Sequence, residues 1–213
     1  MPTAKILPLN HACDTRKRLV NATGVVLSRA GFAGLTPDSV ADAAGVKRRL
    51  LFHHFDGLEG LVKAFSQSPE FWPPASELIG GDEAAIKAMT AEQQIATFFK
   101  RYALALLKRP HTLEILAWET VERNSFSRWL EEVRVRTALE FFELLHEDIP
   151  EEIDLTAIVL VLAAAVSLIA MRSRTSRSWG GIDLHSDKGW KRIEGAIDLL
   201  MQGTLANEGR ARS

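Results

Sequence analysis

The stretch TPDSVADAAGVKRRLLFHHF, residues 36–55, decides the fold of this chain. Thr36 is a suitable helix N-cap, because its hydroxyl can accept a hydrogen bond from a free amide of the first turn. Pro37 suits the first helical position, where no amide donor is needed. Gly45 is typical of the residue that ends a helix at positive φ. The stretch therefore predicts two short helices joined by a glycine turn.

Three cations, Lys47, Arg48 and Arg49, open the second of these helices. Cations in a first turn oppose the helix dipole, so they need a compensating anion or an exposed setting. A phosphate backbone is such an anion, and a short helix pair with a basic second helix is the layout of a DNA-reading helix-turn-helix. The alternative is a solvated charge cluster beside a tight helical corner.

Helical patterns flank this stretch on both sides. Residues 15–30 carry apolar residues at three- and four-residue spacing up to Gly31, and residues 58–65 repeat the pattern. We therefore expect a three-helix unit and a connecting helix in about the first third of the chain.

This third of the chain resembles the tetracycline-repressor (TetR) family of bacterial transcription regulators. The resemblance is carried by Ala30-Gly31-Phe32, Thr36, Val40-Ala41-Asp42-Ala43-Ala44-Gly45-Val46, Leu51-Phe52-His53-His54-Phe55 and Glu59-Gly60-Leu61. We expect DNA contacts from Thr36, Lys47, Arg48, Arg49, Phe52, His53 and His54.

The chain departs from the family pattern at several of these positions. Arg49 and Leu50 stand where the family usually has a small residue and a threonine, Phe52 where it has a tyrosine, and Leu58 where it has a lysine. That tyrosine and that lysine typically touch phosphates, which carry much of the affinity for DNA. Arg48 and Arg49 can replace them. The alternative is a helical ligand- or partner-binding module that has lost sequence-specific DNA binding.

Charge is unevenly distributed along the 213 residues, whose net charge is −1. Residues 1–66 hold nine lysines and arginines against five acidic residues, whereas residues 67–213 hold 17 against 22. A basic N-terminal part and an acidic remainder suit a protein that contacts DNA only through its N-terminal part.

Prolines and glycines between residues 66 and 82 predict a linker. We expect a helix-turn-helix DNA-binding domain with its connecting helix over residues 1–66, and a helical ligand-binding and dimerisation domain over residues 67–213. No strand pattern of useful length appears in the chain. Further helices are expected over about 83–89, 90–110, 111–123, 125–147, 155–171 and 187–206.

Residues 155–171 form a run of 17 residues without a charge. At about 1.5 Å per residue this run only just spans a bilayer core, so a transmembrane helix is one alternative. A helix that is apolar on every side can instead lie between its own domain and a partner subunit. The family resemblance implies a four-helix dimer interface made by the last two helices, although the same residues could be ordinary core. The implied interface residues are Ile158, Leu162, Ala165, Ile169, Trp190, Ile193, Ile197 and Leu200.

The resemblance also implies a small-molecule pocket in the second domain. Aromatic residues, Phe141 among them, are frequent there, and an aromatic-lined cavity with a few polar groups suits a drug-sized ligand. Aromatic residues at helical spacing are equally typical of a core. The candidate ligand-binding residues are Phe98, Tyr102, Glu114, Trp118, Trp129 and Phe142.

Motifs of enzymes and metal sites are missing from the sequence. It has no phosphate-binding glycine loop and no HExxH motif, and the adjacent His53 and His54 point about 100° apart on a helix. We therefore expect no enzymatic activity, no metal and no cofactor.

The expected protein is an all-α, homodimeric transcription regulator of the cytoplasm, where a lone Cys13 is in keeping with a reducing compartment. It is expected to act as a repressor whose partners are double-stranded operator DNA, a second copy of itself and a small-molecule effector, with no membrane involved. Effector binding would change the spacing of the two DNA-binding domains of the dimer, so that they no longer fit successive major grooves.

Overall fold

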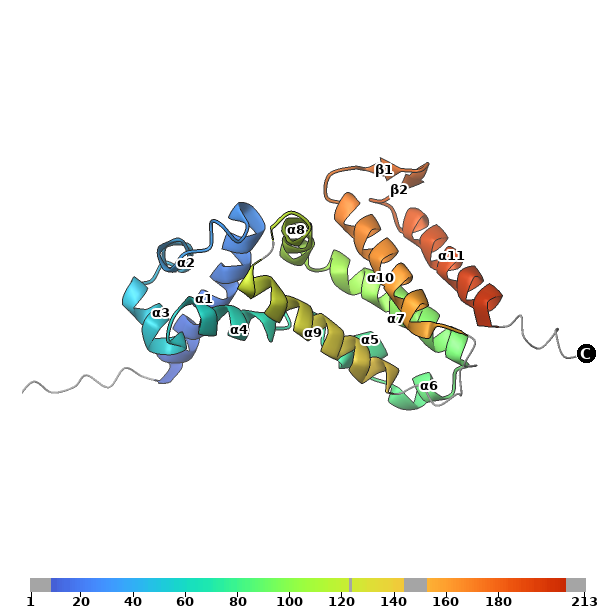
Figure 1. Ribbon diagram of the computed structural model, residues 1–213, viewed down its shortest axis with the longest axis horizontal. Coiled ribbons are helices and arrows are strands. Elements are labelled where there is room, and N and C mark those ends of the chain that lie inside the picture. Colours follow the sequence, from blue (N-terminus) through green and yellow to red (C-terminus); the bar gives the residue numbers. More distant parts are fainter. Residues whose placement is uncertain (1–8, 123, 144–152, 206–213) are drawn as a thin grey trace, which may run out of the picture. The chain divides into compact units, whose positions relative to one another are not determined.

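The computed structural model describes residues 9–122, 124–143 and 153–205, and it is an all-α fold with one short hairpin (Figure 1). This confirms the predicted fold class. In chain order the elements are α1 (Leu9–Ala30), α2 (Pro37–Ala44), α3 (Arg48–Phe55), α4 (Leu58–Ser66), α5 (Ala75–Ile79), α6 (Glu83–Lys87), α7 (Ala91–Leu107), α8 (Pro110–Glu119), α9 (Ser125–Phe142), α10 (Leu155–Arg172), β1 (Ser178–Trp179), β2 (Ile182–Asp183) and α11 (Asp187–Leu205).

The chain divides into two compact units. The first comprises residues 1–72 and 114–134, and the second comprises residues 73–113 and 135–213. The chain passes between the units inside α8 and again inside α9, so each of these helices contributes to both. The domain boundary expected after residue 66 stays a prediction.

The predicted signals of the α2–α3 pair are confirmed. The Thr36 side chain accepts from the Ser39 amide, and the Ser39 hydroxyl accepts from the Thr36 amide, which makes a reciprocal capping box. Gly45 ends α2 with φ 61°, a conformation that glycine adopts without strain. The chain then turns directly into α3.

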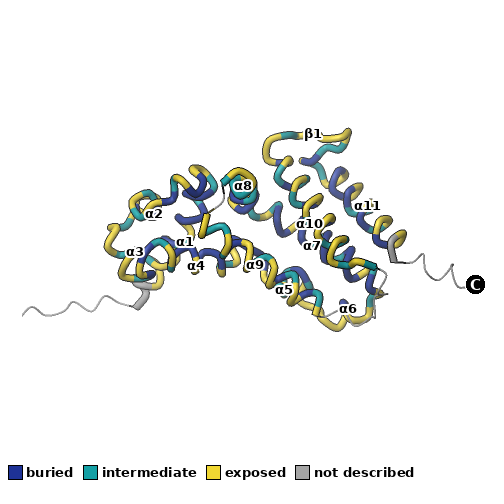
Figure 2. Tube along the Cα trace, viewed as in Figure 1, coloured by how far each residue is buried: buried dark blue, intermediate teal, exposed yellow. Residues whose placement is uncertain are grey.

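The core of the first unit lies where α1 meets α2, α3 and α4. Each of these helices buries apolar residues at helical spacing on the side that faces the others (Figure 2). The fully buried members include Leu19, Val40, Leu51, Leu61 and Val62. This packing holds α3 by one side and leaves Arg48, Arg49, Phe52 and His53 exposed.

The second unit is built around α7, which packs against α5, α10 and α11. This helix starts with a capping box, because Thr90 accepts from the Gln93 amide and the Gln93 side chain accepts from the Thr90 amide. Ile95, Phe99 and Leu106 are completely buried on this helix. The helix therefore carries much of the core of its unit.

Some elements differ from the prediction at their ends. The expected linker contains α5, which starts directly after Pro74, and α8 ends at Glu119 before a turn. The helix that was expected to reach residue 147 is described up to Phe142, and residues 144–147 lie outside the described part.

A hairpin of two-residue strands between α10 and α11 was not predicted. Its turn is Gly180-Gly181, with φ values of 57° and 75°. Two successive positive φ angles are what a type I′ hairpin turn requires, and a Gly-Gly pair is one of the sequences that supplies them. The signal was therefore present in the sequence, although the strands are too short to show an alternating pattern.

The uncharged run forms α10, which among the described helices is the one long and apolar enough to cross a membrane by length and composition. Only 17% of its apolar window is buried within the chain, and Figure 2 shows many exposed positions along it. Its N-terminus is capped by Asp154, whose carboxylate accepts from the Ala157 amide.

Candidate DNA-binding surface and effector site

The exposed side of α3 carries most of the predicted DNA-binding residues. Leu51 and Phe55 anchor the helix in the core, whereas Lys47, Arg48, Arg49, Phe52 and His53 are exposed. Phe52 is an unusual surface residue, because 45% of its area is accessible to solvent. The local packing thus presents three cations and one aromatic ring together at the start of α3.

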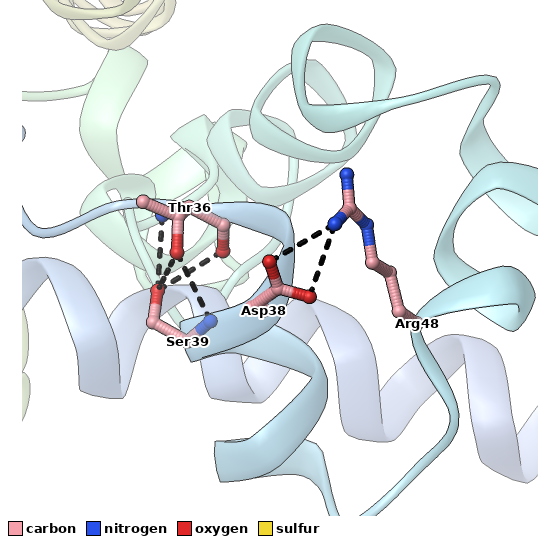
Figure 3. A network of polar contacts seen from close by, with 4 residues as sticks. All are labelled: Thr36, Asp38, Ser39 and Arg48. Atoms are coloured by element: carbon pink, nitrogen blue, oxygen red, sulfur yellow. Dashed lines mark hydrogen bonds and ion pairs between the residues drawn. The ribbon is translucent and has the colours of Figure 1, made fainter.

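Arg48 is paired within the protein. Its Nη1 donates to both carboxylate oxygens of Asp38 on α2, at 3.3 and 3.0 Å (Figure 3). Its guanidinium also lies over the Phe52 ring, 5.5 Å from the centroid. Within the protein, the anion beside this cation is therefore Asp38, and a DNA contact of Arg48 stays a prediction.

Lys47 and Arg49 differ from Arg48 in this respect. Within the described residues neither side chain makes an ion pair, and both are exposed. Lys47 is the N-cap residue of α3 and makes no side-chain capping bond. These two cations are the ones whose charge is left uncompensated at the unfavourable end of the helix dipole.

Two arginines of α1 donate hydrogen bonds to the backbone of the helix pair, and no sequence pattern indicated either role. Arg18 donates to the carbonyl oxygens of Ala44 and Gly45 at 2.6 and 3.1 Å, which satisfies the free C-terminal end of α2. Arg16 donates to the carbonyl oxygen of His54 at 3.1 Å and lies over the Phe55 ring. Arg18 thus connects the end of α2 to α1, and Arg16 connects the end of α3 to α1.

The two histidines of α3 lie in different environments. His53 is exposed and His54 is half-buried, with ring centroids 5.1 Å apart. Burial lowers the pKa of His54, and the neighbouring His53 and Arg16 charges lower it further. Thr36 is exposed, but its hydroxyl already serves the cap of α2.

The segment after α8 contacts the end of α1. The Glu122 carboxylate accepts from the backbone amides of Phe32 and Ala33, at 2.8 and 3.1 Å. The indole of Trp118 donates to the carbonyl oxygen of Ser28 at 3.3 Å. A Cβ at Gly31 would come within 2.9 Å of both side chains, and its φ is 64°, so glycine is required there.

The structure brings three predicted ligand residues together in the second unit. The Phe98 ring lies 6.1 Å from Tyr102 and 5.4 Å from Phe142, and Phe141 joins the cluster at 4.5 Å. Tyr102 shares a hydrogen bond of 2.7 Å with Ser167 on α10. We call Phe98, Tyr102, Phe141 and Phe142 the aromatic cluster.

Gln94 lies one helical turn before Phe98 and was not predicted as a site residue. Its side chain is buried, and Nε2 donates to the carbonyl oxygen of Met89 at 2.9 Å. Its Oε1 is buried without a hydrogen-bond partner among the described residues. If the two amide atoms were exchanged, Oε1 would face the Met89 carbonyl oxygen, and two acceptors would meet without a hydrogen. The assignment in which Nε2 donates is therefore the favourable one, and the unpaired atom is the acceptor Oε1.

The remaining predicted ligand residues, Glu114, Trp118 and Trp129, belong to the first unit. Trp118 contacts α1, and the Trp129 ring lies 6.3 Å from Phe126. Neither tryptophan has a ring contact with the aromatic cluster among the described residues, and a ligand role for the three residues stays a prediction.

The predicted dimer residues fall into two groups. Leu162 of α10 and Trp190, Ile193 and Ile197 of α11 are buried within their own chain, where both helices pack against α7. Ile158 and Ile169 are half-buried, whereas Ala165 and Leu200 are exposed. A dimer role for all eight residues stays a prediction, and exposed apolar neighbours on the same two helices are further candidates. Large apolar residues of this kind are Leu160, Val161, Leu168, Leu199 and Leu200.

Metal-binding and ionic features are limited in the part of the chain that the structure describes. No group of three or more His, Cys, Asp or Glu residues there is placed to hold a metal ion. Glu119 and Arg134 form a largely buried ion pair of 2.9 Å in the first unit, and burial raises the pKa of Glu119 in spite of Arg134.

Residues 19–65, which cover most of α1 and all of α2 and α3, match the sequence model of bacterial regulatory proteins of the tetR family. No curated protein sequence matches the chain. Solved structures are similar in fold. The fatty acid degradation regulator FadR from Bacillus halodurans has a TM-score of 0.64 at 15% identity, over 95% of this chain and 98% of that one.

Two further solved structures are similar over most of their length. FadR from Bacillus subtilis, in complex with stearoyl-CoA, has a TM-score of 0.62 at 16% identity, over 87% of this chain and 96% of that one. A TetR family transcription regulator from Marinobacter aquaeolei VT8 has a TM-score of 0.60 at 15% identity, over 88% of this chain and 97% of that one. At such identities the likeness shows the shared fold.

Proposed function

Because residues 19–65 match the sequence model of bacterial regulatory proteins of the tetR family, we propose that this chain is a repressor of that family and binds operator DNA as a homodimer. It is a helix-turn-helix transcription regulator, and a small-molecule effector releases it from the operator. It acts in the cytoplasm and catalyses no reaction. Its partners are double-stranded DNA, a second copy of the chain and the effector.

The observation that carries the proposal is the uncompensated charge of Lys47 and Arg49 at the start of α3. Two exposed cations at the positive end of a helix dipole are unfavourable in the free protein. Phosphates would neutralise both cations, and each neutralised phosphate releases counterions from the duplex. The α1–α4 core supports this role, because it holds α3 by Leu51 and Phe55 and leaves the first turn accessible.

Homodimer formation is supported by the exposed apolar side of α10 and α11. Leu160, Val161 and Leu199 expose 68%, 66% and 71% of their surface, although they are large apolar residues. Exposed apolar surface of this kind marks an interaction site, and a second copy of the same two helices is a self-complementary partner. A dimer of this kind carries two α3 helices, one for each half-site of a two-fold symmetric operator.

The effector site is proposed at the aromatic cluster and Gln94. The four rings are apolar, and Gln94 Oε1, one helical turn before Phe98, is a buried acceptor that a hydroxyl or amide group of a bound effector would satisfy. FadR from Bacillus subtilis was solved with stearoyl-CoA. We therefore choose stearoyl-CoA, together with aromatic alcohols and amides, as probes for this chain.

Selection of bound fragments from random duplex DNA tests the proposal. The wild-type protein is expected to enrich a two-fold symmetric sequence whose half-sites lie about one helical turn, or a multiple of it, apart. Enrichment of no sequence by a folded protein would contradict the proposal and support the alternative, a helical binding module without sequence-specific DNA binding.

A further inference from the structure

We propose that Arg48 reads a guanine base, that Asp38 positions it for this task, and that Lys47 and Arg49 contact phosphates. The inference rests on the proposed DNA-binding function and adds which residues of α2 and α3 determine sequence choice. Asp38 makes no contact with DNA in this assignment and acts through Arg48.

The contacts of Arg48 leave one edge of its guanidinium available. Both hydrogen bonds to Asp38 use Nη1, whereas Nη2 and Nε have no partner among the described residues. A guanidinium holds its five N–H donors in a rigid plane. The edge that carries Nη2 and Nε therefore presents two parallel donors, which match the O6 and N7 acceptors of guanine in the major groove.

Asp38 and Phe52 together restrict where this edge can point. Asp38 holds one nitrogen at 3.0 Å, and the Phe52 ring lies 5.5 Å from the guanidinium carbon. Arg48 and Phe52 are four residues apart and hence neighbours on one side of α3. A long side chain that is fixed before it binds loses less conformational freedom on binding. Figure 3 shows the Arg48 guanidinium reaching from the start of α3 toward Asp38 on α2.

The charge of the pair argues for base reading over phosphate binding. The Asp38 and Arg48 side chains are 65% and 55% exposed, so an unpaired Asp38 would repel a nearby phosphate. As a pair they are close to neutral, so Arg48 offers little net attraction to the backbone. Lys47 and Arg49 lack such a partner within the described residues and keep their full charge. The three cations are thus divided into one that is oriented and two that are uncompensated.

A purely structural role for the Asp38–Arg48 pair makes a different prediction. Exposed ion pairs contribute little to stability, and Asp38 also lies in the first turn of α2, where an acid suits the helix dipole. If stabilisation were the only effect of the pair, its loss would lower stability slightly and leave base preference unchanged. Base preference is therefore the readout that separates the two roles.

The experiment uses the operator that the wild-type protein selects from random duplex DNA. Binding is measured to this operator, to operators with each G·C pair replaced in turn, and to unrelated DNA, over a range of salt concentrations. The variants are Asp38→Asn with Arg48→Gln, which removes the pair without changing net charge, Asp38→Ala alone, and Arg49→Gln. Melting temperatures establish that each variant remains folded.

The double variant is expected to lose discrimination at one G·C pair in each half-site, by about 5- to 150-fold, which is the usual range for a bidentate contact. Its affinity for unrelated DNA and its salt dependence should equal those of the wild type. Asp38→Ala should reduce the preference for guanine at the same base pair. Arg49→Gln should weaken binding to all sequences alike and lower the log-log salt slope by about one for each subunit.

Three outcomes overturn the inference while leaving the proposed function intact. The first is a double variant that keeps the base preference of the wild type. The second is an Asp38→Ala variant with unchanged base preference, which would remove the positioning role of Asp38. The third is an Arg49→Gln variant that changes base preference instead of the salt slope. A folded wild-type protein that selects no sequence would overturn the proposed function and the inference with it.

Discussion

Glu122 accepts a hydrogen bond of 2.8 Å from the backbone amide of Phe32, a residue 90 positions earlier in the chain. The same carboxylate oxygen accepts from the next amide, so one side chain satisfies two donors of the turn that follows α1. This contact joins the segment between α8 and α9 to the base of the helix-turn-helix.

Replacing Glu122 by alanine should therefore leave a part-buried amide of Phe32 without an acceptor. We expect the free energy of unfolding to fall by about 1–3 kcal/mol, since an unsatisfied buried donor costs that much. Denaturant unfolding and hydrogen exchange of the Phe32 amide measure the effect. Glu122→Gln, which keeps an acceptor oxygen, is the control and should retain most of the stability. Equal losses in both variants would show that the charge matters and the hydrogen bonds do not.

Removing Arg134 should make stability depend on pH through Glu119. Burial already raises the pKa of this carboxyl above its ordinary value, and Arg134 opposes that rise. Without Arg134 the folded-state pKa rises further, so the charged carboxylate destabilises the folded state at neutral pH. This penalty disappears as the pH falls through the folded pKa toward the unfolded value.

Arg134→Leu is thus expected to cost up to about 3 kcal/mol at pH 7 and less at pH 5. Urea unfolding at the two pH values measures the difference. The double variant Glu119→Gln with Arg134→Leu contains no buried acid at this position and should lose the pH dependence. A loss of equal size at both pH values in Arg134→Leu would contradict the assignment to Glu119.

Charges on the exposed side of α10 and α11 should separate the subunits without unfolding them. Val161→Glu with Leu199→Glu places charges on surfaces that are open in the single chain but buried in the proposed dimer. We expect a folded monomer by light scattering, where the wild type is a detergent-free dimer. Val121→Glu, which alters an exposed residue of the first unit, should remain dimeric. A monomeric wild type, or one that needs detergent, would refute the dimer proposal.

Effector binding should raise the melting temperature and release DNA. A molecule that binds only the folded state adds about 2.7 kcal/mol at 100 times its dissociation constant. In a thermal-shift screen of stearoyl-CoA and of aromatic alcohols and amides, at least one probe is expected to stabilise the wild type. Gln94→Met removes the unpaired acceptor at similar volume and should weaken that probe's binding while leaving DNA binding intact. If no probe stabilises the protein, or if Gln94→Met binds it equally well, the site is misassigned.

Short-range signals were sufficient to predict most of the fold. Thr36, Gly45 and Thr90 act on amides or backbone angles within a few residues, so the helix ends that they define can be read from a local pattern. The Asp38–Arg48 and Glu122–Phe32 contacts join residues 10 and 90 positions apart, and no local pattern reports them.

The exposed side of α10 and α11 could not be predicted from the sequence, for a different reason. Because α10 is apolar on every side, its sequence does not distinguish the side that faces α7 from the side that is exposed. On α11 the apolar stripe of Trp190, Ile193 and Ile197 indicates a buried side, and the partner that buries it is α7 of the same chain. Burial in the folded unit was needed to assign Leu160, Val161 and Leu199 to the open side.

In the proposed function, the protein binds DNA through the first turn of α3. The measurement that tests it most directly is the salt dependence of binding to the selected operator, for the wild type and for Lys47→Gln with Arg49→Gln. We predict weaker binding to every duplex and a log-log slope lower by about two for each subunit, because two phosphate contacts are lost. An unchanged affinity and an unchanged slope would contradict the account.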